Sequence, residues 1–144
     1  MKFLLISLLF FLAGSPETVV AAPENNTPES ETRRAERLLE EFYGAYCRDI
    51  ACPSGTKSDK LFERYLTEKL VDKIKKVGEE NGYDLVIRAQ DFNRNALETI
   101  TAAHVAGNWY AVAYLDSYTH KCVIIPVKVV PVDGTLRLDD IAAE

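Results

Sequence analysis

The sequence predicts an α+β fold in which amino-terminal helices pack on a curved antiparallel β-sheet. Apolar residues recur at helical spacing only in the first part of the chain, before about residue 80. Beyond that point the pattern changes to short β-branched or alternating segments separated by turn signals. Helices followed by a run of hairpin-linked strands are typical of α+β domains, because parallel sheets need a helix between successive strands.

Residues 1–21 have the pattern of a cleavable signal peptide. Lys2 gives a positive start, and residues 3–13 are almost entirely apolar. Such a run has the length of a signal-peptide apolar region and falls well short of the ~20 residues of a membrane-spanning helix. Compact residues at Val19 and Ala21 predict cleavage after Ala21. The alternative is a buried amino-terminal helix.

The exported product is predicted to carry no lipid or membrane anchor. Ser15 stands where a bacterial lipoprotein has its acylated cysteine, and a hydroxyl cannot form the required thioether. No later segment approaches the length of a membrane-spanning helix. We therefore expect a periplasmic or secreted protein, with a flexible leader at residues 22–29 and a single α+β domain at residues 30–144.

Three helical segments are predicted before the strands. The first begins at the N-cap Ser30 and runs to about Cys47, with one apolar face formed by Ala35, Leu38, Leu39, Phe42, Tyr43 and Tyr46. A short helix capped by Ser58 or Asp59 follows. Thr67 is the N-cap of the third helix, which ends near Gly78.

The remaining chain predicts strands joined by tight turns. The expected strands are Leu85–Ile87, Leu97–Ala106, Trp109–Leu115, Cys122–Val130 and Thr135–Ile141, with a polar loop at residues 91–95. Gly107-Asn108 and Asp133-Gly134 are hairpin signals, and Asp-Gly is the stronger of the two. Pro126 predicts a bulge or an edge position, because proline cannot donate to a strand ladder.

Charge and composition exclude several classes of function. The formal net charge is −5, which disfavours binding to the phosphate backbone of nucleic acids. The densest basic group, residues 73–76, has acidic neighbours and is typical of a solvated helix face. The chain has only His104 and His120, and no set of four donors at zinc-like spacing, so we expect no metal and no cofactor. The sequence predicts no particular oligomeric state.

The three cysteines allow several redox arrangements in an oxidising compartment. A Cys47–Cys52 disulfide would close a short turn over residues 48–51. Cys122 opens an apolar strand and is expected to be a buried thiol, although a bridge from Cys122 to either of the others remains an alternative.

Four short motifs resemble a known family of exported bacterial domains. They are residues 42–46 (FYGAY), 65–70 (YLTEKL), 89–92 (AQDF) and 138–141 (LDDI). They are similar to domain of unknown function 3828, the YbjP-like domains, within the nuclear transport factor 2-like or cystatin-like superfamily. Leu136 stands where many relatives have an aromatic residue, and Ser15 replaces the lipoprotein cysteine. The resemblance implies a helix-on-curved-sheet fold and an envelope location, and it implies no established activity.

The strand at 109–115 supplies most of the candidate binding residues. Trp109, Ala111, Ala113 and Leu115 share one face, and Tyr110, Val112, Tyr114 and Asp116 share the other. The small alanines leave room for a ligand or admit large helix side chains, and close packing is the commoner arrangement. The tyrosine face is either a protein interface or covered by the chain's own loops. The weak binding candidates are Asp91, His104, Trp109, Tyr110, Tyr114 and Asp116; no residue is assigned a catalytic role.

Two functional hypotheses follow. We favour an exported binding or interaction module, a protein-partner accessory or immunity-type factor that meets another envelope or secreted protein. This hypothesis predicts an exposed apolar patch. The alternative is a small-molecule-binding protein or enzyme that uses a cone-shaped cavity between helix and sheet. That alternative predicts a deep pocket with converging Asp and His or Tyr side chains. The adjacent Asp139 and Asp140 are expected to point to opposite faces of their strand.

Overall fold

The protein is described by a computed structural model that covers residues 29–52 and 58–143. The predicted signal peptide and its cleavage site lie outside these residues. Helices come first and strands follow, in the order α1 (Glu31–Ala51), α2 (Ser58–Tyr65), α3 (Glu68–Asn81), the short 3₁₀ helix η1 (Arg94–Thr99), β1 (Thr101–Ala106), β2 (Trp109–Leu115), β3 (Cys122–Val132) and β4 (Thr135–Ile141). The strands form one antiparallel sheet in the order β1-β2-β3-β4. The predicted α+β class is confirmed.

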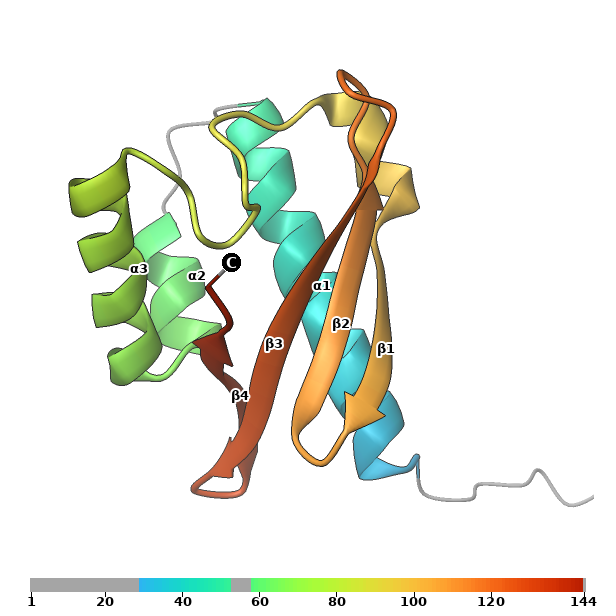
Figure 1. Cartoon of the computed structure of the whole chain (residues 1–144). Coiled ribbons are helices and arrows are strands. Elements are labelled where there is room, and N and C mark those ends of the chain that lie inside the picture. The colour runs from blue at the N-terminus through green and yellow to red at the C-terminus, as the bar shows by residue number, and fades with distance from the viewer. Residues whose placement is uncertain (1–28, 53–57, 144) are drawn as a thin grey trace, which may run out of the picture.

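The helices cover one face of this sheet and one of its edges. Helix α1 runs along the length of the sheet on its inner face, while α2 and α3 lie beside β4 (Figure 1). The hydroxyl of Ser30 caps α1 by accepting a hydrogen bond from the backbone of Arg33, as the sequence predicted. Thr67 caps α3 in the same way.

The carboxyl end of α1 differs from the prediction. Residues 48–51 form the last turn of the helix instead of a loop between Cys47 and Cys52. Residues five apart on a helix lie about 140° apart around its axis. The two thiols therefore do not face each other, and Cys47, Cys52 and Cys122 are all free thiols. Cys47 is buried, but Cys122 is exposed at the start of β3, so the expectation that Cys122 is buried is wrong.

Both predicted hairpins are present. In the β3–β4 turn, Asp133 and Gly134 both adopt positive φ angles, 49° and 78°, between the paired residues Val132 and Thr135. Positive φ at both central positions is the backbone of a type I′ turn, which Asp-Gly favours. In the β1–β2 turn, Gly107 has φ 56°.

One predicted strand, Leu85–Ile87, is wrong, and another, Leu97–Ala106, begins later than predicted. Leu85, Val86 and Ile87 form a turn closed by a single bridge between Asp84 and Ala89, yet all three side chains are buried. A short apolar run is compatible with either a strand or a buried turn. The segment before β1 folds as η1, because the side chain of Asn93 caps it, and the strand begins only at Thr101.

Pro126 lies on β3, an inner strand, which the sequence did not predict. Ile141, the last residue of β4, pairs with Val127. Pro126 comes just before Val127, so it lies beyond the last regular pair between β3 and β4 and is tolerated there. The carbonyl of Pro126 accepts from the amide of Ala142 at 3.0 Å. Proline has no N–H, so Pro126 cannot donate to the carbonyl of Ala142 in return. The guanidinium of Arg88 donates to that carbonyl instead.

The bulge or edge position predicted at Pro126 is wrong, and a bulge occurs instead on β4, at Asp139. Lys128 pairs with Asp140 and Val129 pairs with Leu138, which leaves Asp139 as the extra residue. A bulge turns one side chain out of the regular alternation.

Candidate functional site

Of the two alternatives for the tyrosine face of β2, the structure shows the covered one, with the helices as the cover. Tyr110, Val112 and Tyr114 are buried against the helices, so neither tyrosine forms an exposed interface. Ala111 and Ala113 point to the other side and do not admit helix side chains. Alternation fixes which residues share a face, but it does not fix which face is buried, and here the larger aromatic rings fill the interior.

The space between α1 and the sheet is filled by the protein's own side chains. Phe42, Tyr43 and Tyr46 of α1 are buried in this core, and Phe42 lies 5.4 to 6.4 Å, between ring centroids, from four other aromatic rings, two of which belong to α2. Tyr114 completes this packing with its ring 5.0 Å from that of Phe92. Its hydroxyl donates to the carbonyl of Ile87 at 2.7 Å, and burial raises its pKa to about 12.

The remaining predicted candidates have local structural roles. Asp116 holds the β2–β3 turn, where its carboxylate accepts from the hydroxyl of Thr119 at 2.6 Å and from the amide of Tyr118 at 3.0 Å. These bonds, that from Thr119 first, lower the pKa of Asp116. The ring of His104 contacts the carbonyl of Gly107 at 2.9 Å, on the exposed strand β1.

The structure brings only His104 and Tyr110 together among the predicted candidates, as cross-strand partners whose ring centroids lie 5.2 Å apart, and the candidates do not form one site. Asp91 is exposed and caps its own loop by accepting from the amide of Phe92. Trp109 is half-buried on the outer face, away from the buried rings of Tyr110 and Tyr114. The candidates are therefore divided between the two faces, the turns and the edge of the sheet.

The outer face of the sheet carries an uncharged patch, bordered by Lys128, which pairs with Trp109. We call it the outer face patch; it comprises Ala103, Trp109, Ala111, Ala113, Leu115, Cys122, Ile124 and Pro126. Cross-strand pairing places Ala111 beside Pro126, and Ala113 beside Ile124. Leu115 is 46% exposed and Ile124 is 55% exposed. Among the described residues no helix lies on this face (Figure 1).

The free edge of β1 is closed by two carboxylates from α1. The outward amides of Ala102 and His104 donate to Glu40 at 3.2 Å and to Glu36 at 3.0 Å. Glu36 and Glu40 are one helical turn apart, so they match alternate residues of the adjacent strand. An unpaired strand edge is a template for association, and these carboxylates occupy its donors.

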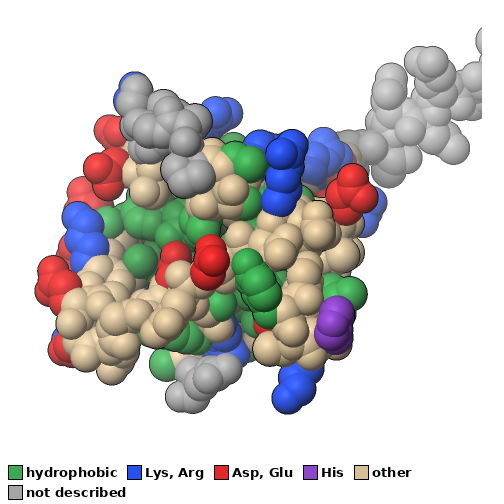
Figure 2. All heavy atoms as spheres, turned by 90° about the horizontal axis from the view of Figure 1, so that it is seen from above, with side chains coloured by type: hydrophobic (Ala, Val, Ile, Leu, Met, Phe, Trp, Pro, Cys, Tyr) green, Lys and Arg blue, Asp and Glu red, His purple; other side chains and the backbone are tan. Residues whose placement is uncertain are grey.

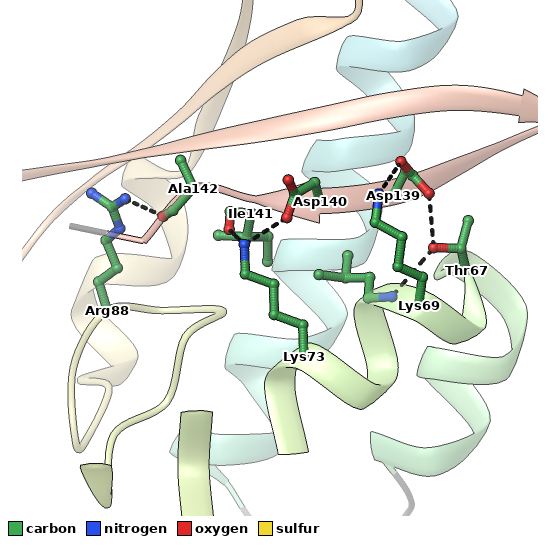
Figure 3. A network of polar contacts seen from close by, with 9 residues as sticks. Thr67, Lys69, Lys73, Arg88, Asp139, Asp140, Ile141 and Ala142 are labelled. Carbon is green, nitrogen blue, oxygen red and sulfur yellow. Dashed lines mark hydrogen bonds and ion pairs between the residues drawn. The ribbon is translucent and has the colours of Figure 1, made fainter. Parts of the chain in front are cut away.

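The other edge, at β4, is closed by α3 and the residues before it. Lys69 pairs with Asp139 at 2.9 Å, and Lys73 pairs with Asp140 at 2.7 Å and donates to the carbonyl of Ile141 (Figure 3). The expectation that the two adjacent aspartates point to opposite faces is wrong, because the bulge at Asp139 turns both carboxylates toward α3.

Two hollows on the surface of the molecule were not identified from the sequence. The first is a recess of about 360 Å³ at the end of the molecule near the carboxyl terminus of α1, where Figure 2 shows hydrophobic side chains gathered in a hollow. Asp84 lines it and accepts from the hydroxyl of Tyr46 at 2.7 Å and from the amide of Val86 at 2.8 Å. Burial, followed by the nearby Asp84, raises the pKa of the Cys47 thiol to about 12, which disfavours the thiolate form.

The second feature is a groove of about 850 Å³ between α2, α3 and the β3–β4 turn. No motif indicates it, because its walls come from segments far apart in the sequence. In the described part of the chain, this groove included, no three His, Cys, Asp or Glu side chains gather closely enough to hold a metal ion. None of the described helices is long and apolar enough to span a membrane.

The fold and these surfaces define a small α+β domain with a filled interior, closed sheet edges and one bare sheet face. A protein of unknown function from Bacteroides thetaiotaomicron VPI-5482, with a crystal structure at 2.10 Å resolution, superposes on it with a TM-score of 0.70. The two sequences are 32% identical over 78% of this chain and 91% of that chain, so this chain belongs to the same family as the Bacteroides protein. No protein-family model and no curated protein matches the sequence.

Proposed function

We propose that this protein is an exported binding module that docks another envelope or secreted protein through the outer face patch. The observation that carries the proposal is the contrast between this patch and the rest of the sheet. Both sheet edges are closed by the protein's own side chains, whereas Leu115 and Ile124 expose apolar surface within the uncharged outer face patch, near the β2–β3 turn. Uncharged apolar surface of this kind is typical of the centre of a protein interface.

The proposal includes the location and family predicted from the sequence. The signal-peptide pattern supports export with cleavage after Ala21, and Ser15 supports a product without a lipid anchor. In this proposal the family is that of domain of unknown function 3828. A Cys47–Cys52 disulfide would require the last turn of α1 to unwind, and a Cys52–Cys122 disulfide would require Cys122 to approach Cys52.

The alternative, a small-molecule site in the cone between helix and sheet, has less support. It predicted an open cavity with converging acid–base side chains. In the described residues the aromatic rings of α1 fill this space, and Asp91, His104 and Tyr114 lie apart.

Site-specific photo-crosslinking in the producing cell tests the proposal. A photoreactive residue at Ala113, on the outer face patch, is expected to give one discrete adduct with a partner protein. The same residue at Glu41, an exposed position on α1, is the matched control. Ile124→Arg, a charge placed at an exposed position beside Ala113, should abolish the adduct while the protein remains folded. Equal adducts from both positions, or an adduct unaffected by Ile124→Arg, would contradict docking through this face.

A further inference from the structure

The groove between α2, α3 and the β3–β4 turn combines an apolar floor with an acidic rim. Its floor is formed by Phe62, Leu66, Val71 and Val132. Carboxylates from all three walls surround this floor: Asp59 and Glu63 from α2, Glu68 and Asp72 from α3, and Asp133 from the turn. The volume, about 850 Å³, is large enough for several side chains of a bound molecule.

The rim carboxylates differ from the acidic residues that form ion pairs. Within residues 29–52 and 58–143, ion pairs are made by Glu29, Glu36, Glu80, Asp139 and Asp140. None of the five rim carboxylates makes an ion pair in the same ranges. On α3 the division follows the helix surface: Lys69 and Lys73 turn toward β4 (Figure 3), while Glu68 and Asp72 line the groove.

The two cations among the described lining residues are fewer than the five rim carboxylates and do not neutralise them. Arg137 donates to the backbone carbonyls of Glu63 at 2.8 Å and of Arg64 and Leu66 at 3.3 Å, so its guanidinium caps the end of α2. Lys75 is the only other cation among the described lining residues. The rim therefore presents an excess of negative charge above a surface that gains free energy when it is covered.

We propose that this groove binds a segment of a partner protein in which apolar side chains are flanked by Lys or Arg. The apolar side chains would cover the floor, and the cations would lie against the rim carboxylates. A single metal ion does not fit this arrangement, because no three potential ligands gather in the described residues. Anionic ligands such as phosphates would be repelled. This site is separate from the outer face patch and does not depend on it.

Peptide binding to the protein produced from its full sequence tests this inference. The probe is an acetylated and amidated peptide of five Lys-Leu repeats carrying a fluorophore, and binding is measured by fluorescence anisotropy at low ionic strength. The comparison peptides replace Lys by Glu, or Leu by Ser. We expect the Lys-Leu peptide to bind, the Glu-Leu peptide not to bind and the Lys-Ser peptide to bind more weakly.

Two triple variants with the same change in net charge locate the site. E63Q/D72N/D133N neutralises one carboxylate in each wall of the groove, and E41Q/E79Q/E98Q neutralises three exposed carboxylates elsewhere. Three exposed ion pairs together correspond to about a tenfold change in Kd, so the first variant should bind about tenfold more weakly and the second nearly as well as the parent. Thr135→Arg, which places a cation in the groove, should also weaken binding, whereas Ile124→Arg on the outer face patch should not.

Several results would overturn the inference. Equal loss of affinity in the two triple variants would mean that only net charge matters. Equal affinity for the Lys-Leu and Lys-Ser peptides would exclude a role for the apolar floor. Absence of binding at high peptide concentration would show that the groove does not bind such a segment. None of these results would affect crosslinking from Ala113, which tests the outer face patch.

Discussion

Ile124 and Ile125 are neighbours on β3, yet Ile124 is 55% exposed and Ile125 is fully buried. They represent the two faces of one sheet. The inner face is covered by α1 and holds most of the buried aromatic and β-branched side chains, whereas the outer face has mainly small and aliphatic residues, with Trp109 and Lys128 at one end, and no helix over them among the described residues. The same strands therefore bury the core on one side and leave apolar side chains exposed on the other.

The largest expected effect comes from truncating this pair. Ile125→Ala removes a fully buried side chain and should reduce the free energy of unfolding by about 3–4 kcal/mol. Ile124→Ala should reduce it by less than about 1 kcal/mol, because most of that side chain is already in water. Urea denaturation of the two variants measures the difference. Similar losses in both would show that the outer face is covered in the folded protein.

A second effect concerns the tyrosine that bonds inside the inner face. Tyr114→Phe removes the donor to the carbonyl of Ile87 and leaves that oxygen without this partner, at an expected cost of about 1–2 kcal/mol. Tyr118, which is 65% exposed in the β2–β3 turn, provides the control. Tyr118→Phe should leave the urea midpoint unchanged, and equal midpoints for both variants would argue against a stabilising bond at Tyr114.

A third effect concerns the edge of the sheet at β1, which Glu36 and Glu40 close. The double variant E36A/E40A exposes the amides of Ala102 and His104, and it should cost about 1 kcal/mol and promote self-association through β1. Analytical ultracentrifugation over a range of concentrations measures this association. The control E41A/E98A has the same change in charge and should stay in the parent's oligomeric state. Association of the control variant to the same extent would point to net charge as the cause.

The smallest expected effect is a pH dependence at the β4 edge. Hydrogen bonds from Lys69 and then Thr67 lower the pKa of Asp139, so the folded protein binds this proton less tightly than the unfolded chain. The stabilisation is therefore present above the unfolded pKa, about 3.9, and is lost as the pH falls through the lower folded pKa. The bond to Asp139 raises the pKa of Lys69, so the contribution of Lys69 is lost only as the pH rises through that higher value.

Urea denaturation across pH tests this pair. Asp139→Asn should lower stability slightly near neutral pH, and the difference from the parent should disappear at strongly acidic pH. Asp133→Asn is the control, because Asp133 makes no ion pair within residues 58–143 and asparagine also tolerates its positive φ. A loss of stability in Asp139→Asn that is the same at every pH would indicate a packing effect.

Local patterns in the sequence were sufficient for much of the fold. The apolar spacing and the N-caps at Ser30 and Thr67 predicted α1 and α3, and Asp133-Gly134 predicted the β3–β4 hairpin. These features depend on side chains bonding to nearby backbone or on the φ angles of single residues, so a short window of sequence contains the necessary information. The same holds for the strand at 109–115, whose limits were predicted correctly.

Only the tertiary structure decided which face of the sheet is bare and where the groove between α2, α3 and the β3–β4 turn lies. Alternation in β2 assigns residues to two faces, but the position of α1 determines that Tyr110 and Tyr114 are inside and Ala113 is outside. The carboxylates that close the β1 edge and those that surround the groove come from segments far apart in the chain, as does the bulge pairing that turns Asp139 and Asp140 toward α3. Such contacts depend on long-range packing and register, which no local pattern specifies.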